Sequence, residues 1–421
     1  MAVTSDNSAD LRRDLGLLDA AGIGIGAVVG AGIFVVIGVA AGIGGASLLV
    51  GLVLAGIAAS ANALSSAQLA AAYPVSGGAY EYGWRVLGPR LGFAAGWMFL
   101  ASKTAALGTV ALGIGAYLGT VLPGVPSRLV AATAVVAFTM LNYRGIRRSS
   151  RANLAIVAVS VGSLLILILC SAGDFEFERL RPFAPAGIPA LLESSAVLFF
   201  AYTGYARIAT LGEEVRDPAR TIPRAIVVTV AVTLILYLAV ALVALGVVGA
   251  DGLAATDAPL ERAARAAGGA PLAVTVAVGG IAAMLGVVLS QLLGLSRMVL
   301  AMARRGDLPR VLEAIHGRFG VPHRAVLLMG GIGVVVALTG SLRTVAEAAS
   351  FTILLYYGIA NLAALRMPAD RKRFPDAVPA VGLTACVVLA LSLAASTIVA
   401  GVAVLGGGYL LRFAVRGAAG R

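Results

Sequence analysis

Long apolar runs separated by short polar segments dominate this sequence of 421 residues. A helix that crosses a lipid bilayer needs roughly 20 mostly apolar residues, so these runs predict membrane-spanning helices. AVILMFWYC residues make up 60% of the chain, charged residues make up 12%, and the mean hydropathy is +0.96, which excludes an ordinary soluble enzyme. We predict an all-α polytopic membrane protein of about twelve helices, at 16–40, 45–72, 92–122, 128–142, 153–172, 190–211, 224–250, 271–303, 324–340, 345–366, 378–394 and 396–414.

The basic residues are distributed unevenly among the connecting segments. The chain has 32 Lys and Arg against 20 Asp and Glu, and all of the basic residues except Lys103 and Lys372 are Arg. If the N-terminus is cytoplasmic, 24 of them fall in cytoplasmic segments and 6 in external ones, while Lys103 and Arg207 lie within helices. Because basic residues collect in cytoplasmic loops, both termini are predicted to be cytoplasmic. This topology explains the net charge of +12 without a nucleic-acid partner.

Residues that could ligate a metal or form a disulfide are few. Cys170 and Cys386 both lie inside apolar runs, and His316 and His323 share one basic loop. We therefore expect no metal site and no disulfide-linked partner subunit. A membrane-embedded enzyme would need a converging nucleophile and base, or a metal-binding arrangement of the HExxH type, and the sequence shows neither. We expect no enzymatic activity and no cofactor.

Glycines interrupt two of the apolar runs. The first reads GIGIGAVVGAGIF from Gly22 to Phe34, and the second reads FFAYTGY from Phe199 to Tyr205. An unpaired backbone N–H or C=O in lipid costs several kcal/mol, so a broken helix persists only where a cavity or a ligand meets it. Interrupted segments at matching positions of two halves indicate a transporter binding site. Close helix packing through small residues is an equal alternative explanation for any one of these glycines.

Several longer motifs occur in an order typical of one transporter family. Gly30-Ala-Gly-Ile-Phe34 is followed by Tyr73-Pro-Val-Ser-Gly-Gly-Ala-Tyr80, and then by Phe199-Phe-Ala-Tyr-Thr-Gly204. The later motifs are Glu213-Glu-Val-Arg-Asp-Pro218, Ile222-Pro-Arg-Ala-Ile226, Ser296-Arg-Met and Ala301-Met-Ala-Arg-Arg-Gly-Asp-Leu-Pro309. From about residue 15 to 370 the chain therefore resembles the permeases of the amino acid-polyamine-organocation (APC) superfamily.

The resemblance implies a LeuT-like fold, in which two five-helix repeats of inverted topology are followed by two further helices. For this chain it implies an N-terminal cytoplasmic tail, two repeats, two additional helices and a C-terminal cytoplasmic tail, at 1–14, 15–172, 190–366, 378–414 and 415–421. The Tyr73–Tyr80 motif is expected to begin the loop between the second and third helices.

The resemblance also implies a substrate site at the broken parts of the first and sixth helices. The substrate carboxylate would meet backbone N–H groups at Gly30, Ala31 and Gly32. The ammonium would meet backbone carbonyls near Phe200, Ala201 and Thr203. Helix-terminus electrostatics favours the same arrangement, because N–H groups at a helix N-terminus attract an anion and carbonyls at a C-terminus attract a cation.

Three aromatic residues of the second interrupted run are similar to the gate that covers substrate in related permeases. They are Phe199, Phe200 and Tyr202, of which Tyr202 is also expected at the substrate. Packing against lipid or against the helix core is the alternative role for these side chains.

The chain departs from the family pattern at the residue expected to couple transport to protons. Proton-coupled relatives carry a Lys seven residues after an Asn in helix 5; here Asn153 is followed at that spacing by Ser160, whose hydroxyl could help to hold sodium or water. Lys103 lies near the middle of the third run, where an ionisable group costs roughly 2.5–3.5 kcal/mol and usually marks function. Burial disfavours its charged form, so Lys103 is the first coupling candidate, or else a fixed positive charge in place of the missing lysine. Pairing to Glu193 or snorkelling to water is the alternative. Glu193 and Arg207 flank the second interruption and are further candidates.

These inferences together predict a secondary active transporter of amino acids that works by alternating access in the cell inner (plasma) membrane. A positive side chain such as Arg207 near the site disfavours cationic substrates, so neutral amino acids are expected. A proton gradient is the expected driving force, with a sodium gradient as the other choice. An exchanger, or a membrane amino acid sensor that does not transport, is also compatible with the sequence. The expected partners are the substrate and membrane lipid.

Overall fold

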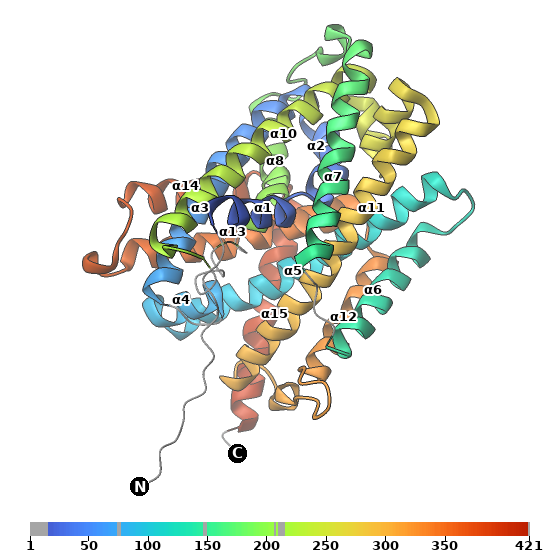
Figure 1. Cartoon of the computed structure of the whole chain (residues 1–421). Helices are drawn as coiled ribbons and strands as arrows, with labels where there is room; N and C mark the ends of the chain where they lie inside the picture. The colour runs from blue at the N-terminus through green and yellow to red at the C-terminus, as the bar shows by residue number, and fades with distance from the viewer. Residues whose placement is uncertain (1–15, 74–76, 146–149, 206–207, 209–214, 420–421) are drawn as a thin grey trace.

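The computed structural model describes residues 16–73, 77–145, 150–205, 208 and 215–419. Within these ranges the chain forms helices, turns and connecting loops, with no β-strand (Figure 1). Eight segments are long and apolar enough to cross a membrane, and four shorter apolar helices accompany them. The all-helical membrane architecture predicted from the apolar runs is therefore confirmed.

The first part of the chain contains one long helical segment that is broken, followed by five further helices. The elements in order are α1 (Leu17–Val28), η1 (Gly32–Val36), α2 (Ile37–Gly44), η2 (Gly45–Ser47), α3 (Leu48–Ala72), α4 (Gly78–Leu87), α5 (Pro89–Val121), α6 (Ser127–Tyr143) and α7 (Ser150–Ser171). The predicted helix at 16–40 thus corresponds to three elements, because the backbone leaves the helical conformation at Val29.

The second part begins with short turns and again contains an irregular segment. Its elements are η3 (Ala172–Asp174), η4 (Phe177–Leu180), α8 (Gly187–Phe199), η5 (Phe200–Tyr205), α10 (Pro218–Ala254), α11 (Pro259–Arg304), η6 (Arg310–Glu313), α12 (His323–Thr339), α13 (Leu342–Arg366), η7 (Ala369–Arg371), α14 (Ala377–Leu391) and α15 (Ala395–Ala419).

Glycines with positive φ explain why α10 and α11 are longer than predicted. Gly249 (φ 69°) and Gly269 (φ 66°) adopt backbone conformations that glycine tolerates and other residues rarely do, and each kinks its helix. The predicted ranges 224–250 and 271–303 match the long parts on one side of each kink. The short parts beyond the kinks contain charged residues such as Asp251 and Glu261, so they do not read as apolar runs.

Helix α4 is absent from the predicted set, which placed a loop after Tyr73. It has ten residues and carries Glu81 and Arg85 on successive turns, so neither its length nor its composition resembles a membrane span. Gly77 precedes its first turn, and Gly88 separates it from α5. A short amphipathic helix of this kind is stabilised by its tertiary contacts rather than by an apolar run.

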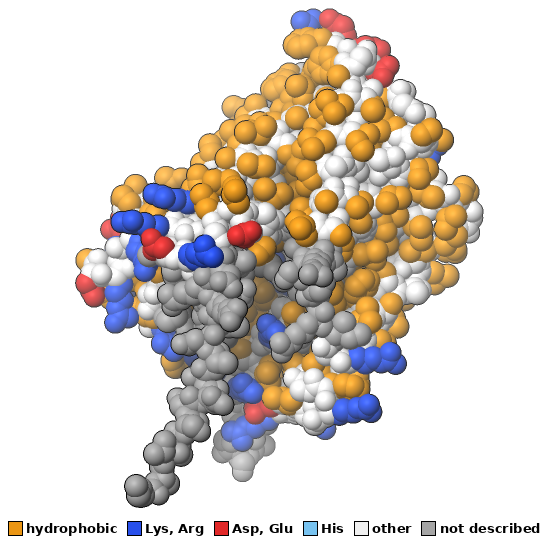
Figure 2. Space-filling view, in the orientation of Figure 1, with side chains coloured by type: hydrophobic (Ala, Val, Ile, Leu, Met, Phe, Trp, Pro, Cys, Tyr) orange, Lys and Arg blue, Asp and Glu red, His pale blue; other side chains and the backbone are white. Residues whose placement is uncertain are grey.

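Hydrophobic side chains cover most of the visible face in Figure 2, over α10, α7, α11 and α6, while Lys and Arg gather along the lower and left margins. The loops with many Arg residues meet on one side of the molecule. Tyr143 at the end of α6 packs against His316 of the α11–α12 connection, and Gln68 of α3 accepts backbone hydrogen bonds from the α13–α14 connection. We refer to this face, which also holds α4 and the end of α15, as the Arg-rich side.

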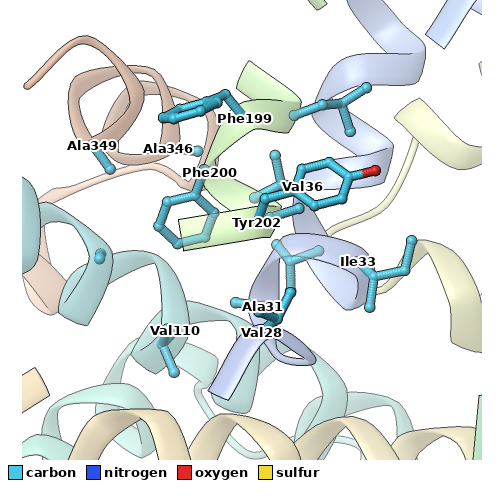
Figure 3. Close-up of a cluster of buried hydrophobic side chains, with 14 of the residues drawn as sticks. Val28, Ala31, Ile33, Val36, Val110, Phe199, Phe200, Tyr202, Ala346 and Ala349 are labelled. Carbon is cyan, nitrogen blue, oxygen red and sulfur yellow. The ribbon is translucent and has the colours of Figure 1, made fainter. Parts of the chain in front are cut away.

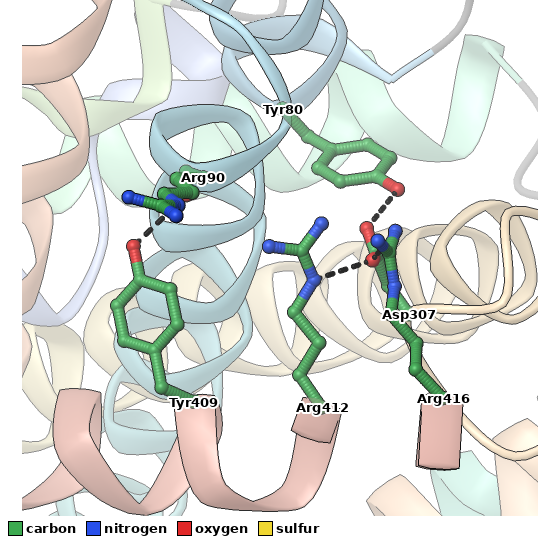
Figure 4. Close-up of polar contacts among 6 residues, drawn as sticks. All are labelled: Tyr80, Arg90, Asp307, Tyr409, Arg412 and Arg416. Carbon is green, nitrogen blue, oxygen red and sulfur yellow. Dashed lines mark hydrogen bonds and ion pairs between the residues drawn. The ribbon is translucent and has the colours of Figure 1, made fainter. Parts of the chain in front are cut away.

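A buried carboxylate joins three elements on the Arg-rich side. Asp307, which follows α11, is 0% exposed and accepts hydrogen bonds from Tyr80 of α4 at 2.8 Å and from Arg412 of α15 at 2.8 Å (Figure 4). Arg416 lies 2.9 Å from the same carboxylate oxygen as Arg412. Burial, followed by the hydrogen bond to Asp307, raises the pKa of Tyr80, so its hydroxyl remains a donor at physiological pH.

Replacing Asp307 with Asn should destabilise the protein strongly. The variant leaves the buried Arg412 without its counter-charge, and breaking a buried ion pair in this way costs about 3–5 kcal/mol. Thermal unfolding of the purified protein in detergent, followed by circular dichroism, measures the effect as a lower melting temperature. The matched control is Asp376→Asn, which removes an exposed ion pair with Lys372 and should cost at most about 1 kcal/mol. Equal shifts in the two variants would contradict this role of Asp307.

Candidate functional site

The first interruption lies between α1 and η1. Val29 is extended (φ −68°, ψ 111°), and a π-helical turn begins at Gly32. The end of α1 therefore presents backbone carbonyls, while the start of the next helical segment presents N–H groups that have no partner within the helix. Both kinds of group belong to residues with apolar side chains. The polar groups at the first interruption are therefore backbone groups.

The second interruption follows α8. The regular helix ends at Phe199, and a 3-10 segment continues from Phe200 to Tyr205. The predicted coupling residue Arg207 comes just after this segment and lies outside the described residues. Thr203 donates a hydrogen bond from its hydroxyl to the carbonyl of Phe200 at 3.0 Å, which uses part of the acceptor capacity of that carbonyl.

The two interrupted segments touch each other through glycine. A Cβ atom added to Gly32 would lie 2.3 Å from the Cα of Ala201, and one added to Gly204 would lie 2.0 Å from the carbonyl oxygen of Ala27. Because real Cβ atoms do not approach backbone so closely, only glycine fits at these two contacts. Close packing through small residues therefore occurs at the two interruptions themselves. The two explanations for these glycines, helix packing and an interrupted backbone, hold at the same positions.

A tyrosine from α10 joins the two segments by hydrogen bonding. The hydroxyl of Tyr237 lies 3.0 Å from the carbonyl oxygen of Val28, in the first segment, and 3.3 Å from that of Ala201, in the second. Tyr237 is fully buried and its ring contacts that of Tyr202. Its single hydroxyl proton is shared between the two carbonyl oxygens, so Tyr237 links the two interruptions.

A cavity of about 360 Å³ opens beside the interruptions. Two further helices, α5 and α11, complete its wall. The lining includes Val28, Gly30, Ala31 and Gly32 from the first segment, Phe200, Thr203 and Gly204 from the second, Phe99, Lys103 and Val110 from α5, and Ser290, Gln291 and Arg297 from α11. Of the residues predicted to bind the substrate backbone, Gly30, Ala31, Gly32, Phe200 and Thr203 thus line one cavity.

The other predicted residues of the second segment do not line the cavity. Ala201 uses its carbonyl to bind Tyr237, and the hydroxyl of Tyr202 donates to the carbonyl of Leu52 in α3 at 3.1 Å. Phe199 is fully buried, with its ring edge-on to that of Tyr357. Figure 3 shows the three aromatic rings of residues 199, 200 and 202 pointing in different directions around η5. Of these three, only Phe200 faces the cavity.

The cavity is electropositive. Lys103 and Arg297 both line it, and none of the described lining residues is Asp or Glu. The Lys103 ammonium lies 5.7 Å from the centre of the Phe99 ring, a distance at which a cation is attracted to the ring face. Within the described part of the chain, neither Lys103 nor Arg297 forms an ion pair.

The remaining coupling candidates lie away from the cavity. The hydroxyl of Ser160 is buried in α7 and donates to the carbonyl of Ile156 at 2.7 Å. Glu193, in the first turns of α8, lies within electrostatic range of Glu347 and Arg343 of α13. The structure shows no ion pair between Lys103 and Glu193, the pairing considered as the alternative role for that lysine.

Sequence reasoning missed the contribution of α11 and of Tyr237. Ser290, Gln291 and Arg297 interrupt the apolar pattern of α11, which was the one available signal that this helix faces a polar space. Tyr237 gives no such signal, because a tyrosine within an apolar run is also common at membrane interfaces. Among the described residues, no group of three or more His, Cys, Asp or Glu is arranged to hold a metal ion.

Comparison with known proteins identifies the family of the chain. A family model described as amino acid permease matches residues 19–417. An uncharacterized transporter of Mycobacterium tuberculosis is 46% identical over 401 residues, covering 95% of this chain and 90% of the relative. The branched-chain amino acid permease of Bacillus subtilis is 30% identical, with coverage of 95% and 92%, and its methylthioribose transporter is 31% identical, with coverage of 88% and 83%. The chain thus belongs to the amino acid permease family, within the APC superfamily of transporters.

Proposed function

We propose that this permease is a proton-coupled symporter that moves neutral amino acids across the cell inner membrane by alternating access. The observation that carries the proposal is the cavity at which two interrupted helical segments, Lys103 and α11 meet. Both termini are taken to be cytoplasmic, because Arg residues are concentrated in the segments on their side. An exchanger of amino acids or amines and a sensor without transport are the alternatives that a flux measurement separates.

The proposed architecture has twelve spans. The eight long apolar segments and four shorter apolar helices support this number, if the short helix α1 crosses the membrane together with η1 and α2. An inverted repeat would relate the helices from α1 to α7 to those from α8 to α13, with α14 and α15 added. The direct contact of the α1–η1 and α8–η5 interruptions supports this pairing, since each begins one of the two halves.

The backbone of the interruptions suits a zwitterion. N–H groups of Gly30, Ala31 and Gly32 begin a helical segment and favour the substrate carboxylate. The carbonyls of Phe200 and Thr203 favour the ammonium, and both residues line the cavity. The carbonyls of Ala201 and Val28 are less available, because both already accept from the hydroxyl of Tyr237. We therefore assign the ammonium mainly to Phe200 and Thr203.

The charges of the cavity favour neutral over cationic substrates. Lys103 and Arg297 repel a cationic side chain, and no described lining carboxylate offsets them. One relative is named as a branched-chain amino acid permease, so branched-chain amino acids are the first substrates to test. Another relative is named as a methylthioribose transporter. Methylthioribose lacks both a carboxylate and an ammonium, so its uptake tests whether transport needs the backbone site.

Lys103 is the proposed proton carrier. It lines the cavity beside Phe99 without a described ion-pair partner, so its charge is free to change with substrate and with the side that is open. Ser160 is a weaker candidate for holding sodium, because its hydroxyl bonds to its own helix and does not line the cavity.

Uptake into proteoliposomes tests the function. Radiolabelled amino acids and methylthioribose are offered with an inward proton gradient, with a sodium gradient, and with neither gradient but substrate inside. Accumulation with the proton gradient alone is the expected result. Flux in the preloaded vesicles alone would indicate an exchanger, and binding without flux would indicate a sensor.

Replacing Lys103 with Met should abolish accumulation driven by a proton gradient while exchange of internal for external substrate persists. The reason is that exchange needs no net proton movement. Initial rates of both reactions in the same proteoliposomes measure the effect. The control is Lys372→Met, which changes the other lysine of the chain, in the α13–α14 connection, and should leave both rates intact. Unchanged accumulation in the Lys103 variant would remove this residue from the mechanism.

Replacing Gly32 with Ala should reduce transport at least tenfold, because the added methyl group would collide with the backbone of Ala201 and separate the two interrupted segments. Gly22→Ala is the matched control in the same region: no atom other than those of its chain neighbours and its own helix backbone lies within 4 Å of its added Cβ, so transport should stay within about twofold of the wild-type rate. Initial uptake rates, normalised to folded protein in the vesicles, provide the comparison. Similar rates in both variants would show that close contact of the segments is not required.

A further inference from the structure

A second cavity, separate from the transport site, lies on the outer surface of the helix bundle. It has a volume of about 640 Å³ and is lined almost entirely by apolar side chains. α5, α12, α13, α15 and the residues that follow α11 form its wall, and its members include Trp97, Ile332, Ala348, Val404 and Leu411. Two of its threonines, Thr104 and Thr352, direct their hydroxyls to carbonyls of their own helices, so they present little polarity. We call this cavity the α12–α15 groove.

The groove runs along α15, which is long and apolar enough to cross a membrane. Its α15 lining extends from Ala400 to Leu411, a rise of roughly 17 Å along the helix. This is close to half of the roughly 30 Å hydrocarbon core of a bilayer, the depth of one leaflet. Several lining side chains are also exposed, including Leu328 at 43% and Val404 at 42%, so the groove opens sideways toward the surface that contacts lipid.

The two ends of the groove differ in charge. At one end the lining residues Thr344 and Ala348 adjoin Arg343 and Glu347. These two side chains form an ion pair, so their charges cancel. At the other end, on the Arg-rich side, the lining residues Leu308, Pro309, Leu312 and Leu411 adjoin a surplus of positive charge.

Asp307 is the acceptor for two arginines at this end, Arg412 and Arg416, so a single carboxylate faces two guanidinium groups. The Arg416 side chain is half exposed, and one terminal nitrogen of the buried Arg412 has no hydrogen-bond partner in the described part of the chain. Arg310 lies between the lining residues Pro309 and Leu312, is exposed, and forms no ion pair with a described carboxylate. An anionic group placed here would find donors and a net positive field.

We propose that the α12–α15 groove binds an anionic phospholipid of the leaflet on the Arg-rich side. One acyl chain occupies the apolar groove, and the phosphate lies at its end beside Arg310 and Arg416. The match of depth to one leaflet and of charge to a phosphate favours this occupant over a zwitterionic lipid, because basic residues at the membrane surface attract anionic headgroups. The site does not depend on the proposed transport function, since it shares no lining residue with the transport cavity.

The chain provides its own reporter for the groove. It has two tryptophans, and one of them, Trp97, lines the groove and donates its ring N–H to the carbonyl of Val404 at 2.8 Å. The other, Trp84 of α4, stacks with Arg305. A Trp84→Phe substitution removes the second tryptophan and keeps an aromatic ring at that contact. Bromine atoms on lipid acyl chains quench tryptophan fluorescence at contact. In the full-length Trp84→Phe protein, quenching therefore reports lipid bound beside Trp97.

The experiment compares brominated phosphatidylglycerol with brominated phosphatidylcholine, each titrated into vesicles of unbrominated phosphatidylcholine that contain this protein. We expect phosphatidylglycerol to bind beside Trp97 at least about fivefold more strongly than phosphatidylcholine. Equal quenching by the two lipids would overturn the proposal.

Two sets of variants separate charge from shape. Arg310→Gln combined with Arg416→Gln should reduce the preference for phosphatidylglycerol toward one, and Arg310→Gln alone, which disturbs no described ion pair, should reduce it in part. The control pair Arg220→Gln and Arg224→Gln removes the same charge from exposed positions on α10 and should leave the preference intact. A preference that survives in the Arg310 and Arg416 variants would contradict the assigned phosphate position.

Ala348→Phe fills the groove and should weaken quenching by both lipids. Val402→Phe adds the same bulk at an exposed position of α15 outside the groove lining and should not. Cross-linking in the same vesicles tests a different occupant. The proposal would be overturned if two copies associate, if this association is lost in Ala348→Phe, and if no lipid preference is found. That result would show that the groove is a protein interface.

Discussion

Backbone N–H and C=O groups inside a membrane protein must find partners, and this requirement organises the structure around its two interruptions. Where α1 and α8 lose regular helix, the buried hydroxyl of Tyr237 shares its proton between the carbonyl of Val28 and that of Ala201. Gly30, Ala31 and Gly32, where the next helical segment begins, line the cavity instead. In the proposed function a substrate carboxylate pairs with the N–H groups of these residues, so the interrupted backbone would serve as the binding site.

The glycines of the interruptions have a double role. Gly32 and Gly204 let the two segments meet backbone to backbone, at contacts where an added Cβ would clash with Ala201 or Ala27. Packing through small residues and a binding site are alternatives in the sequence, but in the structure the close packing occurs at the interruptions that line the cavity. This close contact also fixes the position of Phe200, the one aromatic residue of the predicted gate that faces the cavity.

Charge is used differently in the middle of the molecule and at its Arg-rich side. The buried Asp307 joins α4 and α15 to the end of α11, and its contacts with Tyr80 and Arg412 hold these elements together. In the cavity, Lys103 and Arg297 have no such carboxylate among the described residues. Paired charge thus contributes to the scaffold, whereas Lys103 and Arg297 line the cavity without such a partner.

The sequence by itself determined that the chain is a helical membrane protein, where its long helices lie, and that two of them are irregular, because length, hydropathy and glycine density are local properties. It also placed Lys103 and the stretch from Gly30 to Gly32, which line the cavity. Only the tertiary structure decided which faces turn inward, and so revealed Tyr237, Gln291 and Arg297 and placed Ser160 away from the cavity. In a membrane, buried and lipid-facing surfaces are both apolar, so no hydrophobic period marks the interior face of a helix.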